Sequence, residues 1–165
     1  TKTGKVLQTP LTDFDDLMSI NVKGTLRLSK FVLPVMLKQK HGRIINISSL
    51  SGLLAFANYG FYSASKFALE GVMQSLRYEV YKDNIYVTNI EPGAIRFDDL
   101  NVRNVNTSVR ARFPFVGCLL PLVYPATVYN VIEKIINSHD PPANVLIGRD
   151  TKLLNYFKRF PPTIF

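Results

Sequence analysis

Three side chains near the middle of the chain have the types and spacing that proton transfer to or from an alcohol requires. Ser49 closely follows an isoleucine-rich run at residues 43–47, and Tyr62 and Lys66 lie four residues apart in a segment with few helix-breaking residues. Residues four apart on a helix share one face, so the phenol and the ammonium are expected to be neighbours. The sequence therefore predicts that a hydroxyl, a phenol and an ammonium converge.

The pKa values of these groups suggest their chemistry. A free tyrosine has a pKa of about 10, and a nearby ammonium favours the phenolate, so we expect Lys66 to lower the pKa of Tyr62. The phenol could then take a proton from an alcohol, or give one to a carbonyl oxygen, near neutral pH. Ser49 could hydrogen-bond the same substrate oxygen. This arrangement suggests an interconversion of alcohol and carbonyl, with the hydride exchanged with a separate cofactor.

Strands and long helices are expected to position these groups. The run at residues 43–47 is short and β-branched, and it predicts a buried strand. Ser49 then follows its carboxyl end, where open α/β sheets bind their ligands. A helix is expected from Tyr62 to about residue 81, and a second buried parallel strand at residues 84–91. Apolar residues at mostly helical spacing predict another long helix over residues 13–40.

Four motifs occur in one order between residues 13 and 97. They are Ile20-Asn21-Val22-Lys23-Gly24, Asn46-Ile47-Ser48-Ser49, the Tyr-x3-Lys pair and Glu91-Pro92-Gly93-Ala94-Ile95. Together they closely resemble the classical short-chain dehydrogenase/reductase family. The resemblance implies that Tyr62 is the acid/base, Lys66 lowers its pKa and contacts the nicotinamide ribose, and Ser49 orients the substrate. It also implies that Asn21 distorts its helix and supports the proton relay.

The same resemblance implies NAD or NADP as the cofactor, contacted in this chain by Tyr62, Lys66, Pro92, Gly93 and Ile95. A threonine often follows the Pro-Gly turn in the family, whereas Phe97 stands at that position. The family's glycine-rich phosphate turn has no counterpart here, because neither G-x-x-x-G-x-G nor G-x-G-x-x-G occurs. The chain starts at Thr1 rather than Met, and we expect a carboxy-terminal portion with a catalytic half-site and little of the cofactor site.

The expected fold is α/β, namely the carboxy-terminal half of a Rossmann-like doubly wound parallel sheet, in one domain over residues 1–165. An amphipathic helix at residues 126–137 and a short strand at residues 144–148 complete it. By the resemblance, residues 98–125 form the substrate lid. The apolar second half of that segment favours a hydrophobic substrate, such as a lipid, steroid or long-chain alcohol, with ordinary packing over the sheet as the alternative.

Composition narrows the classes of partner. The net charge is +8, and the basic residues are spread along the chain. A phosphate-bearing cofactor or an acidic partner accounts for this charge. A weak contact with a membrane surface stays open, whereas a nucleic-acid partner needs a clustered basic face and is not expected. The single cysteine, Cys118, excludes an internal disulfide and a cysteine-based metal site and fits a reducing, cytoplasmic compartment. No metal site is expected.

Two further expectations concern assembly. The resemblance implies a homo-oligomer in which the Asn21 helix and the Tyr62 helix pair with their copies. It also implies a strand beside residues 43–47 that this chain lacks, and an unpaired strand edge favours aggregation. A second interpretation is therefore a truncated, catalytically silent module with a structural or interaction role. Cofactor binding at micromolar concentration would reject that alternative.

Overall fold

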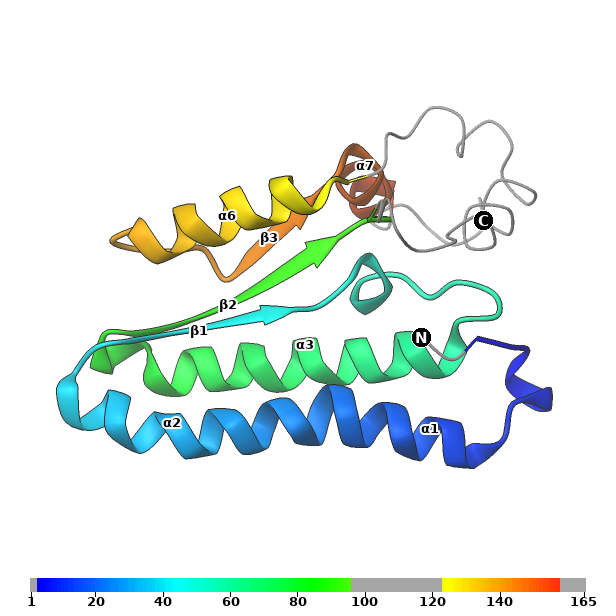
Figure 1. Cartoon of the computed structure of the whole chain (residues 1–165), viewed down its shortest axis with the longest axis horizontal. Coiled ribbons are helices and arrows are strands. Elements are labelled where there is room, and N and C mark those ends of the chain that lie inside the picture. The colour runs from blue at the N-terminus through cyan, green and yellow to red at the C-terminus, as the bar shows by residue number, and fades with distance from the viewer. Residues whose placement is uncertain (1–2, 96–122, 158–165) are drawn as a thin grey trace.

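A parallel sheet with helices on both faces organises the chain (Figure 1). The structure, a computed structural model, describes residues 3–95 and 123–157. The strand order is β1-β2-β3, with β1 at Gly42–Ile47, β2 at Ile85–Pro92 and β3 at Asn144–Ile147. Both pairings are parallel. Within the described residues, β1 pairs only with β2, so its other edge is open.

One face of the sheet is covered by two long helical stretches (Figure 1). The first runs through α1 (Leu11–Met18), η2 (Ser19–Gly24) and α2 (Thr25–Gln39), and the second is α3 (Gly60–Val80). Alternate residues of β1 and β2 point toward α3, because successive strand side chains face opposite sides. The apolar core of this layer consists of Ile44, Leu69, Met73, Val80, Ile85 and Val87.

The opposite face carries α6 (Pro125–Asn137), and α7 (Arg149–Phe157) follows β3. Its core consists of Ile90, Val123, Ile135 and Ile147. Strand β2 therefore supplies apolar side chains to both faces, and all eight of its residues are buried. Its first four residues, Ile85–Thr88, are all β-branched or aromatic, as expected of a strand buried on both faces.

Short turns join these elements. The 3-10 turns are η1 (Val6–Gln8), η3 (Leu50–Gly52) and η4 (Tyr81–Asp83). Lys40 follows α2 and Asn84 follows η4, and both adopt the left-handed conformation, with φ of 53° and 60°. An ion pair between Lys40 and Asp83 holds the two ends together, and the Asn84 side chain donates to the Lys40 carbonyl at 3.2 Å.

The expected α/β parallel fold is confirmed, and so are the expected strands and the helices at residues 62–81 and 126–137. The long helix expected over residues 13–40 is present but changes to π geometry at Ser19–Gly24. The expected lid, residues 98–125, lies outside the described residues except for its last three. Phe97 and Cys118 also lie outside the described residues. Among the described residues, no helix is long and apolar enough to cross a membrane, and no cluster of His, Cys, Asp or Glu could hold a metal ion.

Candidate active site

Ser49 lies just beyond the carboxyl end of β1, as the sequence predicts. The preceding residue is fixed to the neighbouring strand, because the Ser48 backbone N–H donates to the Ile90 carbonyl at 2.8 Å. Ser49 then begins the turn η3, and its Oγ accepts a hydrogen bond from the backbone N–H of Ser51 at 3.1 Å. The hydroxyl is thereby held at the ligand-binding edge of the sheet.

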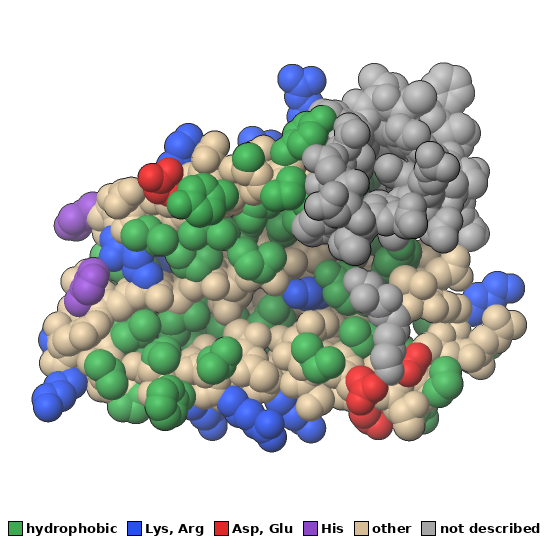
Figure 2. Space-filling view, in the orientation of Figure 1, with side chains coloured by type: hydrophobic (Ala, Val, Ile, Leu, Met, Phe, Trp, Pro, Cys, Tyr) green, Lys and Arg blue, Asp and Glu red, His purple; other side chains and the backbone are tan. Residues whose placement is uncertain are grey.

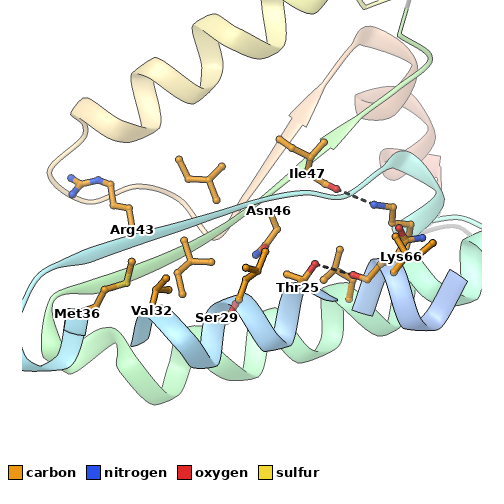
Figure 3. Close-up of a pocket in the computed structure, with 14 residues that line it drawn as sticks. Thr25, Ser29, Val32, Met36, Arg43, Asn46, Ile47 and Lys66 are labelled. Atoms are coloured by element: carbon orange, nitrogen blue, oxygen red, sulfur yellow. Dashed lines mark hydrogen bonds between the residues drawn. The ribbon is translucent and has the colours of Figure 1, made fainter. Parts of the chain in front are cut away.

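Tyr62 and Lys66 lie on the first turns of α3, one helical turn apart. The Lys66 Nζ is 5.8 Å from the centre of the Tyr62 ring, and it donates to the Ile47 carbonyl oxygen at 3.0 Å (Figure 3). The Ser49 side chain lies close enough to the Tyr62 phenol to lower its pKa. The structure therefore brings together the three side chains that the sequence singled out.

Burial controls the pKa values of both α3 groups. It raises the pKa of Tyr62, and the Ser49 hydroxyl opposes this effect only in part. The net lowering that we expected from Lys66 is not found, because burial dominates the shift. The Lys66 ammonium donates to the Ile47 carbonyl. Burial likewise lowers the pKa of Lys66, and the negative charge of Glu70 opposes that shift. Both effects follow from the cost of holding a charge away from water.

Asn21 lies within the π-helical turn η2, and its side chain reaches α3. Its Nδ2 donates to the Ser65 Oγ at 3.0 Å, and that hydroxyl donates to the Tyr62 carbonyl at 2.8 Å. The Thr25 hydroxyl donates to the Asn21 carbonyl at 3.0 Å (Figure 3). The helix distortion expected at Asn21 is thus present, and π turns of this kind are frequent at functional sites.

Ser65 is a site residue that the sequence analysis missed. It lies between Tyr62 and Lys66 in the sequence. Its side chain is fully buried, and its hydroxyl links η2 to α3. A signal was available, because serine is a poorer choice than alanine inside a helix unless its hydroxyl has a partner. The partner, however, is 44 residues away and is visible only in the folded chain.

A cavity of about 480 Å³ lies between the helical stretch and the open edge of β1. Lys66 lines one end, and Met36 and Arg43 line the other (Figure 3). Asn21 is also among the lining residues. All five residues 43–47 line it, although their side chains alternate between the two faces of the sheet. Such continuous lining indicates that the edge of the strand itself forms the wall.

The turn expected to contact the cofactor ends β2, the strand next to Ser49. The Gly93 N–H donates to the Ile147 carbonyl at 2.9 Å, so the turn is attached to β3. Ile95 forms an isolated parallel bridge with Val123. Ser49 thus follows the carboxyl end of β1 and Pro92 ends the adjacent parallel strand β2, so they lie at the same edge of the sheet.

Comparison with known proteins gives relatives of one kind. The chain is 32% identical over 142 residues to 3-ketodihydrosphingosine reductase of Bacteroides thetaiotaomicron, a match that covers 79% of this chain and 53% of the relative. It is 45% identical over 92 residues to the dehydrogenase/reductase SDR family protein 7-like of Anopheles gambiae, covering 56% of this chain and 29% of the relative. The chain thus spans about half the length of the first of these proteins.

Solved structures agree in fold. A short-chain dehydrogenase from Streptomyces avermitilis superposes with a TM-score of 0.81 at 28% identity, covering 96% of this chain and 61% of that protein. 4-Hydroxyisoleucine dehydrogenase complexed with NADH gives a TM-score of 0.73 at 27% identity, covering 89% and 62%. The family model described as short chain dehydrogenase matches residues 1–107, which include every motif quoted above. The chain therefore belongs to the short-chain dehydrogenase family.

Proposed function

We propose that the protein containing this chain is an NAD(P)-dependent oxidoreductase that interconverts a secondary alcohol and a ketone. The observation that carries this proposal is the convergence of Ser49, Tyr62 and Lys66 beyond the carboxyl end of β1. Family membership supports an oxidoreductase, and the NADH-bound state of 4-hydroxyisoleucine dehydrogenase supports a nicotinamide cofactor.

Tyr62 is the proposed acid/base, and Ser49 is the proposed anchor for the substrate oxygen. Ser49 lies close enough to the Tyr62 phenol to lower its pKa, so a substrate oxygen between the two hydroxyls would contact both. In the oxidative direction the alcohol proton passes to the Tyr62 oxygen, and in reduction the phenol returns it to the ketone oxygen. The raised pKa of Tyr62 favours the protonated phenol, which is the form that reduction requires.

Lys66 and Asn21 support that proton transfer. Lys66 holds a positive charge beside the Tyr62 ring and lines the cavity together with Asn21. We infer that Asn21 acts through Ser65, because that hydroxyl joins the Asn21 amide to the Tyr62 carbonyl. The hydrogen bonds fix the orientation of the first turns of α3, which is the positioning that acid/base catalysis needs.

The residues present suit the nicotinamide end of a dinucleotide. A bound NAD or NADP would accept or supply the hydride. Lys66 offers a cation at the cavity, and Pro92, Gly93 and Ile95 form a turn at the same edge of the sheet. We propose these residues, with Tyr62, as the part of the cofactor site that this chain supplies.

We also propose a hydrophobic ketone or alcohol as the substrate. The relative from Bacteroides thetaiotaomicron is named as a reductase of 3-ketodihydrosphingosine, which is a lipid ketone. The apolar segment at residues 113–125 agrees with such a substrate. Turnover of long-chain ketones well above that of short polar ketones is the expected result, and an equal or reversed preference would contradict it.

Exposed apolar side chains on α2 support a homo-oligomer. Leu28, Phe31 and Val35 follow helical spacing and are 69%, 82% and 63% exposed. Figure 2 shows hydrophobic side chains at the surface over this helix, among Lys and Arg side chains. A second copy that covers this stripe would remove apolar area from water. Phe31→Asp should lower the sedimentation coefficient, and an unchanged coefficient would contradict this interface.

The alternative is a catalytically silent module, favoured by the open edge of β1 beside the cavity. One experiment separates the two functions. Tyr62→Phe in the natural protein should lower turnover about 100-fold or more, because the acid/base hydroxyl is lost. Tyr78→Phe is the matched control, since Tyr78 lies on the same helix and is 72% exposed. Both variants are assayed by nicotinamide absorbance. Equal turnover of the two variants would contradict the dehydrogenase mechanism.

A further inference from the structure

A polar layer that is buried except at its Asn144 end lies between α3 and the carboxyl-terminal half of the sheet. The layer comprises Asn46 and Ser48 from β1 and its end, Asn89 and Glu91 from β2, Asn144 from β3 and Glu70 from α3. The strand residues occupy alternate positions, so they share the face that further along the same strands carries Ile44, Ile85 and Val87. Glu91 is 0% exposed and Asn89 is 3% exposed. A carboxyl group so deeply buried needs a specific explanation.

Hydrogen bonds join this polar layer into one network. Asn46 donates to the Asn89 side-chain oxygen at 3.1 Å, and Asn89 donates to the Glu70 Oε2 at 2.6 Å. The Asn144 amide donates both to the Glu70 Oε2, at 3.3 Å, and to the Glu91 Oε1. A single amide group therefore bridges the two carboxyl groups. The network connects all three strands to α3.

The network contains more acceptors than donors. Within the described part of the chain, the Glu70 Oε1, the Glu91 Oε2 and the Ser48 Oγ are buried and have no hydrogen-bond partner. A Cβ on Gly52 would lie 2.9 Å from the Ser48 Oγ and 3.2 Å from the Glu70 Oε1, so this glycine allows the loop to approach both groups. Burial, with a smaller contribution from the negative charge of Glu70, raises the pKa of Glu91 to about 7.

The two carboxyl groups adjoin the proposed catalytic elements. Glu70 lies one helical turn after Lys66, and its charge opposes the burial that lowers the pKa of that lysine. Glu91 directly precedes the Pro92–Gly93 turn. Glu70 thus acts on both Lys66 and Glu91, and the Asn144 amide opposes the rise in the pKa of Glu91.

We propose that Glu70 is a positioning residue that keeps the Lys66 ammonium charged, and that the amides of Asn89 and Asn144 hold the Glu70 carboxylate in place. This inference rests on the proposed function, because it concerns the charge of a proposed catalytic group. The Lys66 side chain is 8% exposed, so water alone does not solvate its charge. Among the described residues, Glu70 is the carboxylate that acts on Lys66. The amide donors of Asn89 and Asn144 fix the position of the Glu70 carboxyl group.

The test measures the charge of Lys66 directly. The natural protein is labelled with 13C-lysine, and the Cε signal of Lys66, assigned with Lys66→Arg, is titrated by NMR. In Glu70→Gln the titration midpoint should fall by at least one pH unit, because the opposing negative charge is gone. Glu79→Gln is the control, since Glu79 is exposed on the same helix. An equal midpoint in the two variants would overturn the proposal.

Activity gives a separate readout. In Glu70→Gln, kcat should fall about tenfold or more above the shifted midpoint and stay within about threefold below it, while Glu70→Asp restores part of the profile. An altered midpoint in a protein without dehydrogenase turnover would support this inference and contradict the proposed function. If Glu70→Gln does not fold, Asn144→Ala at the exposed end of the network should shift the midpoint in the same direction. An unmoved midpoint there would also overturn the proposal.

Discussion

The layer between α3 and the sheet is apolar at one end and polar at the other. Toward the amino ends of the strands, Ile44, Ile85 and Val87 pack against α3. Toward the carboxyl ends, the same face carries Asn46, Asn89 and Glu91. One helix and two strands therefore supply two different environments. The apolar end stabilises the fold, whereas the polar end costs stability and lies beside the proposed catalytic groups.

This contrast implies different sensitivities to pH. Burial of apolar area does not depend on protonation, so the apolar end should stabilise the protein equally across the working pH range. The polar end contains Glu91, whose charge changes near neutral pH, and its contribution should vary with pH. Substitutions at matched depths in the two ends can test this difference.

The largest effect is expected at the apolar end. Met73 belongs to α3 and is fully buried in the core. Met73→Ala removes apolar contacts and leaves a cavity. We expect the free energy of unfolding to fall by about 2–5 kcal/mol, by a similar amount at each pH, in urea titrations between about pH 5 and pH 8. A loss that changed strongly with pH would show that the two ends do not differ in the way described.

A comparable effect, but dependent on pH, is expected at Glu91. Its pKa rises from 4.5 in the unfolded chain to about 7 in the folded protein, so the folded state binds the proton more tightly. The stability that this proton contributes is present below pH 4.5 and is lost as pH rises toward 7. Glu91→Gln keeps the shape without the charge. The variant should gain about 3 kcal/mol relative to the wild type over that interval.

The same urea titrations check this prediction. The stability curves of Glu91→Gln and the wild type should separate as pH rises and run parallel above about pH 8. Curves that stay parallel from acidic to neutral pH would mean that Glu91 does not titrate in the folded protein near pH 7. The polar end would then resemble the apolar end in its response to pH.

The smallest effect is expected at Ser65 of α3, which is hydrogen-bonded to Asn21 of η2. Ser65→Ala removes the hydrogen bond from Asn21 and the one to the Tyr62 carbonyl. We expect a loss of about 1–2 kcal/mol, because the Asn21 amide loses a partner, together with several-fold lower turnover in the natural protein. Ser75→Ala, at an exposed position of α3, is the control. Equal stability and turnover of the two variants would assign Ser65 no role in positioning.

Local patterns sufficed to predict most elements of this fold. The isoleucine-rich run at residues 43–47 and the run at residues 84–91 became β1 and β2, because strands inside a parallel sheet are rich in β-branched residues. The spacing of Tyr62 and Lys66 placed both on one face of α3, because helix periodicity is itself local. The order of the motifs also predicted the family correctly. The single domain and the lid remain predictions.

Other features depend on residues that are far apart in the sequence. The bond from Asn21 to Ser65 and the bridge from Asn144 to Glu70 join positions 44 and 74 residues apart. The raised pKa of Tyr62 follows from burial, which the spacing of the Tyr-x3-Lys motif does not contain. The sequence by itself therefore determined the elements and the reactive groups. The tertiary structure decided their partners and charges, because hydrogen bonding and desolvation depend on which surfaces the folded chain brings together.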